Sequence, residues 1–208
     1  YHEGLRRIGL PYEVIAPEDL TAERLAGLSI LLLPPLPPER IEDGGREAVT
    51  QWVNDGGLLV GFATEGLDEL FGIEIEGVLG HVGDEFTPAG CISLEDEDWT
   101  GPLLPAYERA AALPVIAPIS VIRAPGCREL ARLRSCFEQD LRRPAITWRK
   151  VGEGAACWWA FDLAQCLWKM QQGRPVYEDF DGDGKLRTMD MVVTRPWPGD
   201  IPYADLMC

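Results

Sequence analysis

The sequence predicts an α/β fold with a mostly parallel sheet, helices on both faces, and a second half that is rich in β-structure. Two observations indicate this fold. In the first 72 residues, segments with helical spacing alternate with short apolar segments, which is the order of strands joined by crossover helices. From Ile73 onward the helical periodicity fades, and alternating or β-branched stretches replace it. We therefore expect a three-layer domain.

The first half supplies helices and strands in strict alternation. Helical spacing predicts helices over residues 2–8, 21–26, 41–53 and 67–71. Apolar runs between them predict strands over residues 12–15, 30–33 and 58–62. The run from Ile30 to Leu33 is apolar without interruption, as in a parallel strand that is covered on both faces. A strand just before Tyr1 would complete the pattern.

The second half consists mainly of predicted strands. They cover residues 73–82, 115–123, 129–133, 145–150 and 155–161. Residues 151–154, with two glycines, predict a hairpin turn between the last two strands. A helix over residues 162–171 would then pack Leu163, Leu167 and Met170 inward.

Composition and charge narrow the classes of partner. The chain has 208 residues, 46% of them hydrophobic, enough to bury a substantial core. Its formal net charge of −15 repels phosphate backbones and anionic lipids, so we expect no nucleic-acid partner and no membrane partner. Six cysteines at irregular spacings, without a CxxC pair, are typical of reduced thiols. The sequence starts without an initiator methionine or signal peptide and stops in an apparent helix turn, so we expect a fragment of a longer protein.

The segment from Asp179 to Asp190 predicts a calcium-binding loop. Calcium takes oxygen ligands, and a twelve-residue loop supplies them at positions 1, 3, 5, 7, 9 and 12, with glycine at position 6. Gly184 stands at position 6, and position 12 is aspartate where glutamate is usual. An acidic, glycine-rich surface turn is the alternative, but three carboxylates within five residues would repel one another without a cation. The predicted ligands are Asp179, Asp181, Asp183, the Lys185 carbonyl, a water beside Arg187, and Asp190.

This loop resembles those of EF-hands and of dockerin modules. Dockerins carry two such loops with a helix after each, whereas this loop occurs once. Residues 192–198, which follow it, contain two prolines and cannot continue a helix. We therefore expect a fixed structural calcium ion, because a calcium switch needs paired hands that open. The loop also favours an extracytoplasmic location.

Several segments together resemble the class I glutamine amidotransferase-like superfamily. The likeness is to its branch related to the trimerisation domain of β-galactosidases and to trehalose-utilisation-like proteins. It implies a flavodoxin-like α/β fold. The segments that carry the resemblance are Tyr12–Ile15, Leu28–Pro34, Trp52–Val60, Leu70–Ile73 and Val151–Leu163.

The catalytic residues of that superfamily are missing here. A working amidotransferase uses a cysteine at the strand-to-helix elbow, activated by a histidine with a carboxylate behind it. The elbow after residue 62 reads Ala63-Thr64-Glu65-Gly66, and the sequence has no histidine after His81. The alternative is a hydrolase with its site at the strand ends near Thr64 and Glu65, although either residue would also suit an exposed turn that caps the next helix.

Three further groups of residues could form a site. A Cys91/His81 dyad lacks a third group to orient it, so a surface histidine is the simpler interpretation. The acidic run from Glu95 to Asp98 is typical of a solvated face. The tryptophans favour sugar stacking and hence a carbohydrate-binding module, with Trp99, Trp148 and Trp197 the candidates for exposure.

We therefore expect residues 1–175 to form an amidotransferase-like α/β domain that is β-rich from about residue 73. Residues 176–208 would form a C-terminal segment with the calcium loop and continue into a longer protein. The function that fits is a non-catalytic structural or interaction domain of a carbohydrate-active protein. Its expected partners are calcium, carbohydrate, and either a second copy or other domains of a longer chain.

Overall fold

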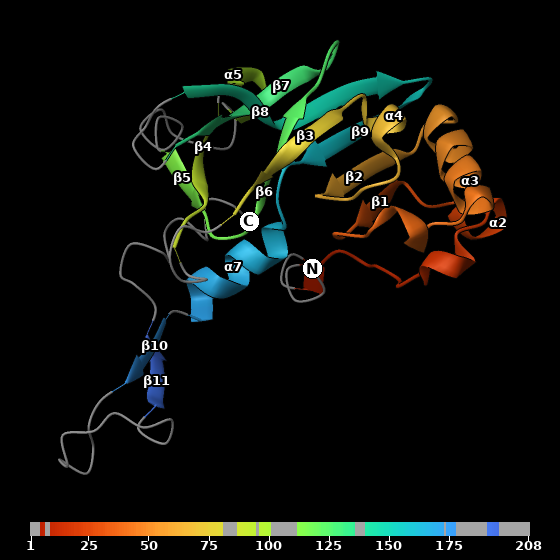
Figure 1. Cartoon of the computed structure of the whole chain (residues 1–208). Helices are drawn as coiled ribbons and strands as arrows, with labels where there is room; N and C mark the ends of the chain where they lie inside the picture. The colour runs from red at the N-terminus through yellow and green to blue at the C-terminus, as the bar shows by residue number, and fades with distance from the viewer. Residues whose placement is uncertain are drawn as a thin grey trace.

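Figure 1 shows the computed structural model, which describes residues 5–6, 9–80, 87–94, 96–100, 112–135, 140–172, 174–177 and 191–195. A curled seven-stranded sheet forms its centre. The strands of this sheet are β1 (Ile30–Leu33), β2 (Leu58–Phe62), β4 (Gly90–Leu94), β5 (Ala112–Val115), β7 (Arg128–Arg134), β8 (Asp140–Val151) and β9 (Gly154–Trp159). They are arranged in the order β1-β2-β9-β8-β7-β4-β5.

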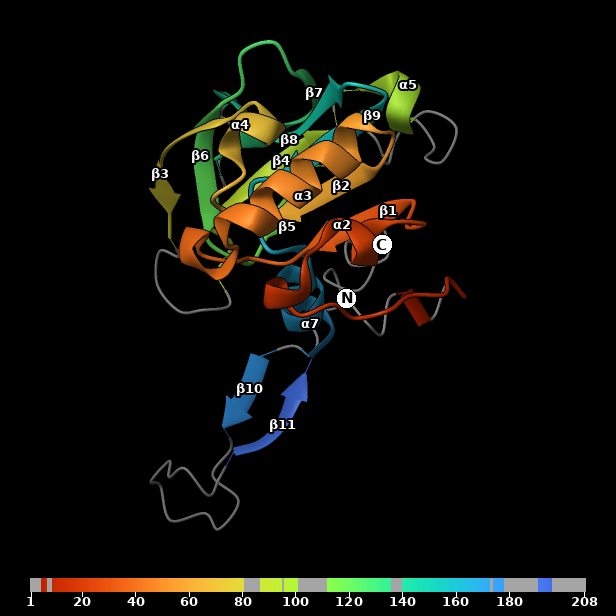
Figure 2. The ribbon, with the colours of Figure 1, turned by 90° about the vertical axis from the view of Figure 1, so that its right-hand side faces the viewer.

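Two small antiparallel sheets accompany the main one. The first pairs β3 (Glu74–Leu79) with β6 (Ile119–Arg123), and the second pairs β10 (Arg174–Tyr177) with β11 (Met191–Arg195). In both views β10 and β11 lie below the main sheet and α7 (Figures 1 and 2).

The helices are short, apart from two. They are η1 (Pro17–Asp19), α2 (Ala22–Leu25), η2 (Pro38–Arg40), α3 (Asp43–Asn54), α4 (Asp68–Phe71), α5 (Glu97–Thr100) and α7 (Leu163–Gln172). Figure 2 shows α3 and α4 in front of one face of the sheet, and α7 below the strands. Among the described residues, no helix has both the length and the apolar character needed to cross a membrane.

Side-chain alternation assigns the two faces of the parallel strands. Leu31, Leu59 and Trp158 point to the face under α3 and α4, and all three are buried. The opposite face of β1 and β2 is less covered: Leu32 and Val60 are half-buried there, and Ile30 is exposed. The expected layer of helices on both faces is therefore only partly present in the described part of the chain.

The expectation of a mostly parallel sheet is wrong. Only β1–β2 and β2–β9 are parallel, whereas β9–β8, β8–β7, β7–β4 and β4–β5 are antiparallel. Parallel neighbours need a long crossover connection, which α3 provides between β1 and β2. In the second half, the tight turn at Gly152 returns β9 beside β8 and makes this pair antiparallel.

Most other predicted elements are present with shifted bounds. The helix over 21–26 is confirmed as α2, and Thr21 caps it by accepting a hydrogen bond from the Arg24 amide at 3.3 Å. Residues 12–15 belong to no helix or strand and join no ladder among the described residues, so that predicted strand is wrong. Of the helix over 2–8, only residues 5–6 are described, and they are helical. β4, β10 and β11 were not predicted.

Candidate functional site

The turn after β2 is the place where the sequence puts a catalytic elbow, and its backbone is unusual there. Ala63 has a φ of +48°, in the left-handed region that residues with a Cβ rarely adopt. The Ala63 amide donates to the Trp159 carbonyl oxygen at 2.8 Å, which holds the turn against the end of β9. Ala63, the residue held in this left-handed conformation, thus has only a methyl group as its side chain.

Thr64, the next residue, is fully buried and its hydroxyl is already engaged. The Oγ1 atom lies 3.0 Å from the Leu33 carbonyl oxygen and 2.9 Å from that of Pro34, so its single proton is shared between these acceptors. The same oxygen accepts from the Phe62 amide at 3.2 Å. This hydroxyl ties the carboxyl ends of β1 and β2 together and has no open path to a substrate.

Glu65 is exposed, and its backbone amide donates to the Leu36 carbonyl oxygen at 3.0 Å. Its side chain is held by no hydrogen bond or ion pair among the described residues. Of the two residues that the sequence singled out at the elbow, Thr64 is therefore a structural clamp, and Glu65 is a surface carboxylate.

Asp68 is a carboxyl group near the elbow that sequence reasoning missed. Burial raises its pKa, and the hydrogen bond from the Gly66 backbone only partly opposes that effect. Its Oδ1 atom is buried without a hydrogen-bond partner among the described residues. A carboxyl with a raised pKa beside a strand end is a functional candidate in physical terms. Its burial depends on how α4 packs, which no local sequence pattern indicates.

Three of the four described thiols are poor nucleophiles. Burial raises the pKa of Cys157 and of Cys166 to about 12, and it also raises that of Cys127. Such groups stay protonated and inert near neutral pH. The proposed partner of Cys91, His81, lies outside the described residues, as does His2.

The predicted calcium loop also lies outside the described residues, so its ligands Asp179, Asp181, Asp183, Lys185, Arg187 and Asp190 are not placed. Its flanks are described. β10 ends at Tyr177, β11 begins at Met191, and the two residues are paired across an antiparallel ladder. The two ends of the segment that carries the loop are thus held together. In the part of the chain that the structure describes, no three His, Cys, Asp or Glu side chains gather as a metal site.

An aromatic cluster lies near α5. Trp159 has its ring centroid 5.7 Å from that of Phe62, 5.8 Å from that of Phe161 and 6.4 Å from that of Trp99. Trp99 is the outermost member and is 37% exposed. The predicted exposure of Trp99 is therefore confirmed. Trp148 is half-buried, and Trp197 lies outside the described residues.

Charged groups flank this cluster. Arg128 donates to both carboxylate oxygens of Asp96, and it also approaches Asp98 at 3.3 Å. The Trp99 amide donates to Asp96 at 3.0 Å, which fixes the start of α5. The Arg128 pair lowers the pKa of the Asp96 carboxyl. An exposed indole beside carboxylates and a guanidinium can stack on an apolar ring face and bind hydroxyl groups.

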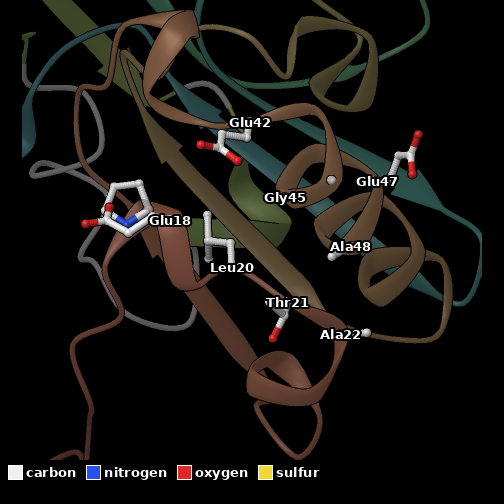
Figure 3. Close-up of a pocket in the computed structure, with 10 residues that line it drawn as sticks. Glu18, Leu20, Thr21, Ala22, Glu42, Gly45, Glu47 and Ala48 are labelled. Atoms are coloured by element: carbon white, nitrogen blue, oxygen red, sulfur yellow. The ribbon is translucent and has the colours of Figure 1, made fainter.

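A surface cavity of about 410 Å³ opens between η1, α2 and α3 (Figure 3). Glu18, Glu42 and Glu47 line it, with Leu20 and Thr21. In Figure 3 the carboxylate of Glu42 lies in the upper middle of the view and that of Glu47 at its right side, separated by α3, and the described residues form no metal-ligand cluster. No residue of the turn after β2 lines this cavity, so it is separate from the elbow.

Comparison with known proteins identifies a fold but no family. No protein-family model matches the sequence, and no curated protein matches it. Among solved structures, a β-galactosidase from Rahnella sp. R3 has a TM-score of 0.58 and 19% identity, over 76% of this chain and 23% of that one. A cytoplasmic protein from Salmonella typhimurium has a TM-score of 0.58 and 12% identity, over 78% and 74% of the two chains.

A ThuA-like protein from Bacteroides uniformis has a TM-score of 0.54 and 12% identity, over 77% of this chain and 71% of that one. At such identities the likeness concerns the fold alone. The resemblance to β-galactosidases and to ThuA-like proteins is therefore confirmed at the level of the fold. The chain spans about a quarter of the length of the β-galactosidases that it matches.

Proposed function

We propose that this chain is a non-catalytic, amidotransferase-like domain with a structural or interaction role in a larger carbohydrate-active protein. The turn after β2 carries the proposal. Its left-handed residue is Ala63, without a reactive group, and the next residue, Thr64, has its hydroxyl bonded to main-chain carbonyls. A nucleophile needs a free lone pair, a base that takes its proton, and access for the substrate. Thr64, fully buried, has no access.

The link to carbohydrate chemistry rests on fold likeness. The matched β-galactosidase is about four times as long as the matched region, so the likeness covers one part of a larger enzyme. Fold likeness is a weaker warrant for function than a site, so a β-galactoside belongs among the substrates that test the proposal.

An assay of the purified chain tests the absence of catalysis. We expect no turnover of a chromogenic β-galactoside or of L-glutamine above the rate in buffer. The alternative is a hydrolase that uses the carboxyls beside the elbow, Glu65 or Asp68. Turnover that disappears in Glu65→Gln or Asp68→Asn would replace our proposal with that alternative, and unchanged turnover in both variants would point to a contaminant.

The exposed aromatic cluster favours a second function, carbohydrate binding. Trp99 is 37% exposed, and its ring meets that of Trp159 in an edge-to-face contact. Asp98 and Arg128 lie beside it and can bind sugar hydroxyls. Binding through a stacked indole uses the apolar face of a sugar ring and needs no net charge on the ligand.

Titration with galacto-oligosaccharides, followed by tryptophan fluorescence, tests this second function. We expect saturable quenching that Trp99→Ala abolishes. Trp168→Ala is the matched control, because Trp168 is also exposed but lies on α7. Binding that survives Trp99→Ala, or that Trp168→Ala also removes, would count against the Trp99 surface.

The calcium site is also part of the proposal. Residues 179–190 fit the ligand positions of a calcium loop, with aspartate at position 12. The ladder from Tyr177 to Met191 supports it, because a loop whose ends are already joined loses less chain entropy when it wraps an ion. We propose that the ion is structural and stabilises the C-terminal segment, residues 176–208.

A further inference from the structure

The cavity between η1, α2 and α3 has an apolar base of fixed shape. Leu20, Ala22 and Ala48 contribute to its lining, and Leu20 is buried. Gly45 lets α3 approach Leu20 closely, since a Cβ added there would lie 3.5 Å from the Leu20 Cβ atom. The volume of about 410 Å³ falls within the range of roughly 300–1,000 Å³ that is typical of small-molecule sites. The cavity therefore has room for a small ligand without any rearrangement of its base.

Three carboxylates line this cavity, and no basic side chain lines it. Glu18, Glu42 and Glu47 are all exposed. Among the described residues, their side chains take part in no hydrogen bond and no ion pair. Glu42, which precedes α3, does not cap that helix with its carboxylate. All three carboxylates are therefore available to a ligand.

The arginines of the two helices that border the cavity do not neutralise these carboxylates. The Arg24 guanidinium, on α2, lies 3.7 Å from the Glu13 carboxylate. The Arg46 guanidinium, on α3, lies 2.8 Å from Asp43 and also donates to the Pro38 carbonyl oxygen. The cavity thus presents uncompensated negative charge, in a chain whose net charge of −15 already attracts cations.

The separation of the carboxylates indicates the kind of cation that fits. In Figure 3 Glu18, Glu42 and Glu47 are spread from the left side of the view to its right side, with Leu20 between Glu18 and Glu47. A metal ion needs oxygen ligands around one point, and the described residues gather no such set. Ammonium groups joined by methylene chains suit this arrangement, because charged ends can reach separate carboxylates while the methylenes lie on apolar surface.

We propose that this cavity binds a linear polyamine such as spermidine. Its ammonium groups would bind Glu18, Glu42 and Glu47, and its methylene groups would contact Leu20 and Ala48. No residue of the turn after β2 or of the aromatic cluster lines the cavity, so this site is independent of the function proposed above. The affinity should fall as the salt concentration rises, because the carboxylates are exposed and salt screens them.

Calorimetric titration of the purified chain with spermidine tests this site. At constant ionic strength we expect saturable binding of one molecule per chain. The triple variant Glu18→Gln/Glu42→Gln/Glu47→Gln should weaken it by about tenfold or more, because three exposed ion pairs are lost together.

A matched control removes the same charge elsewhere on the chain. Glu65, Glu69 and Glu153 are exposed, and none of them lines the cavity. Their replacement by glutamine in one triple variant should change the dissociation constant by less than about twofold, because salt screens distant charges. Equal losses of affinity in the two triple variants would overturn the proposal, since spermidine would then respond only to the net charge.

A larger side chain at Gly44 gives a second test that leaves the charge unchanged. Gly44 lines the cavity, and a Cβ there meets nothing within 4 Å, so Gly44→Leu has room to enter the space of the ligand. This variant should also weaken binding by about tenfold, whereas Gly77→Leu, at an equally open glycine on β3, should not. No saturable binding to the wild type, or binding that Gly44→Leu leaves unchanged, would overturn the proposal.

Discussion

The indole Nε1 of Trp158 donates a hydrogen bond to the Thr64 carbonyl oxygen, 3.0 Å away, and both residues are fully buried. Trp158 lies on β9 and Thr64 follows β2, so the bond joins segments that are far apart in the sequence. The hydroxyl of the same Thr64 bonds to the end of β1. One residue thus ties together the carboxyl ends of the three parallel strands.

Replacement of Thr64 by valine should destabilise the fold without changing its shape. Valine keeps the volume but leaves the buried Leu33 and Pro34 carbonyls without their donor, which we expect to cost about 1–3 kcal/mol. Thr64→Ser keeps the hydroxyl and should cost less, about 1 kcal/mol for the lost methyl. Urea unfolding measures the free energy of unfolding of both variants. A serine variant less stable than the valine variant would show that packing of the methyl matters more than the hydroxyl.

Removal of the Asp68 charge should stabilise the chain in a pH-dependent way. Burial raises the pKa of this carboxyl in the folded state, so the folded chain resists its ionisation. The resulting penalty is absent below the unfolded pKa of about 3.9 and grows as the pH rises through the folded pKa. The Asp68→Asn variant should therefore have a higher melting temperature than the wild type at about pH 7 and the same melting temperature at about pH 3. A melting temperature of Asp68→Asn below that of the wild type at neutral pH would mean that a hydrogen bond or ion pair stabilises the Asp68 carboxylate.

Two glycine substitutions should have opposite effects. A Cβ at Gly154 would lie 2.1 Å from the Val53 carbonyl oxygen and 2.3 Å from that of Gly57, so Gly154→Ala should cost more than about 3 kcal/mol. A Cβ at Gly44, an exposed position of α3, meets nothing within 4 Å, so Gly44→Ala should gain up to about 1 kcal/mol. Thermal melts of the two variants and the wild type measure these changes in stability. A tolerated Gly154→Ala would contradict the close approach of β9 to the end of α3.

Calcium should raise the melting temperature if the loop holds a structural ion. A ligand that binds only the folded state stabilises it in proportion to its excess over the dissociation constant. We expect the melting temperature to rise in millimolar calcium and to fall back with EDTA. The double variant Asp181→Asn/Asp183→Asn should lose this response, whereas Asp43→Asn, on α3, should keep it. A melting temperature unchanged by calcium would contradict the site.

Local sequence patterns predicted the elements of the first half but not all their neighbours. The apolar runs of β1 and β2, with α3 between them, contain enough information to predict a parallel pair. The placement of β9 beside β2 joins Leu59 to Ala156, and no local pattern encodes such a distant pairing. The stretch at Tyr12 has strand-like residues, but a strand exists only where a neighbour accepts its hydrogen bonds.

The sequence predicted where the candidate site lies, but not the conformation and burial of the residues that form it. The strand end after Phe62 indicated where a turn would lie. The positive φ of Ala63 was not predictable, since alanine normally avoids that conformation and only the contacts around the turn impose it. The burial of Thr64 and Asp68 likewise depends on the distant segments that pack over them. The predicted ligands of the calcium loop, by contrast, can be named from the sequence alone, because they are contiguous in it.

The central claim is that the turn after β2 is a structural clamp and carries no nucleophile. Its most direct test is the mass of the intact folded chain after treatment with diisopropyl fluorophosphate, which modifies activated hydroxyls. The account predicts no increase in mass, because the Thr64 hydroxyl is buried and bonded to the Leu33 and Pro34 carbonyls. One stoichiometric adduct, located at Thr64 and absent in Thr64→Val, would contradict it.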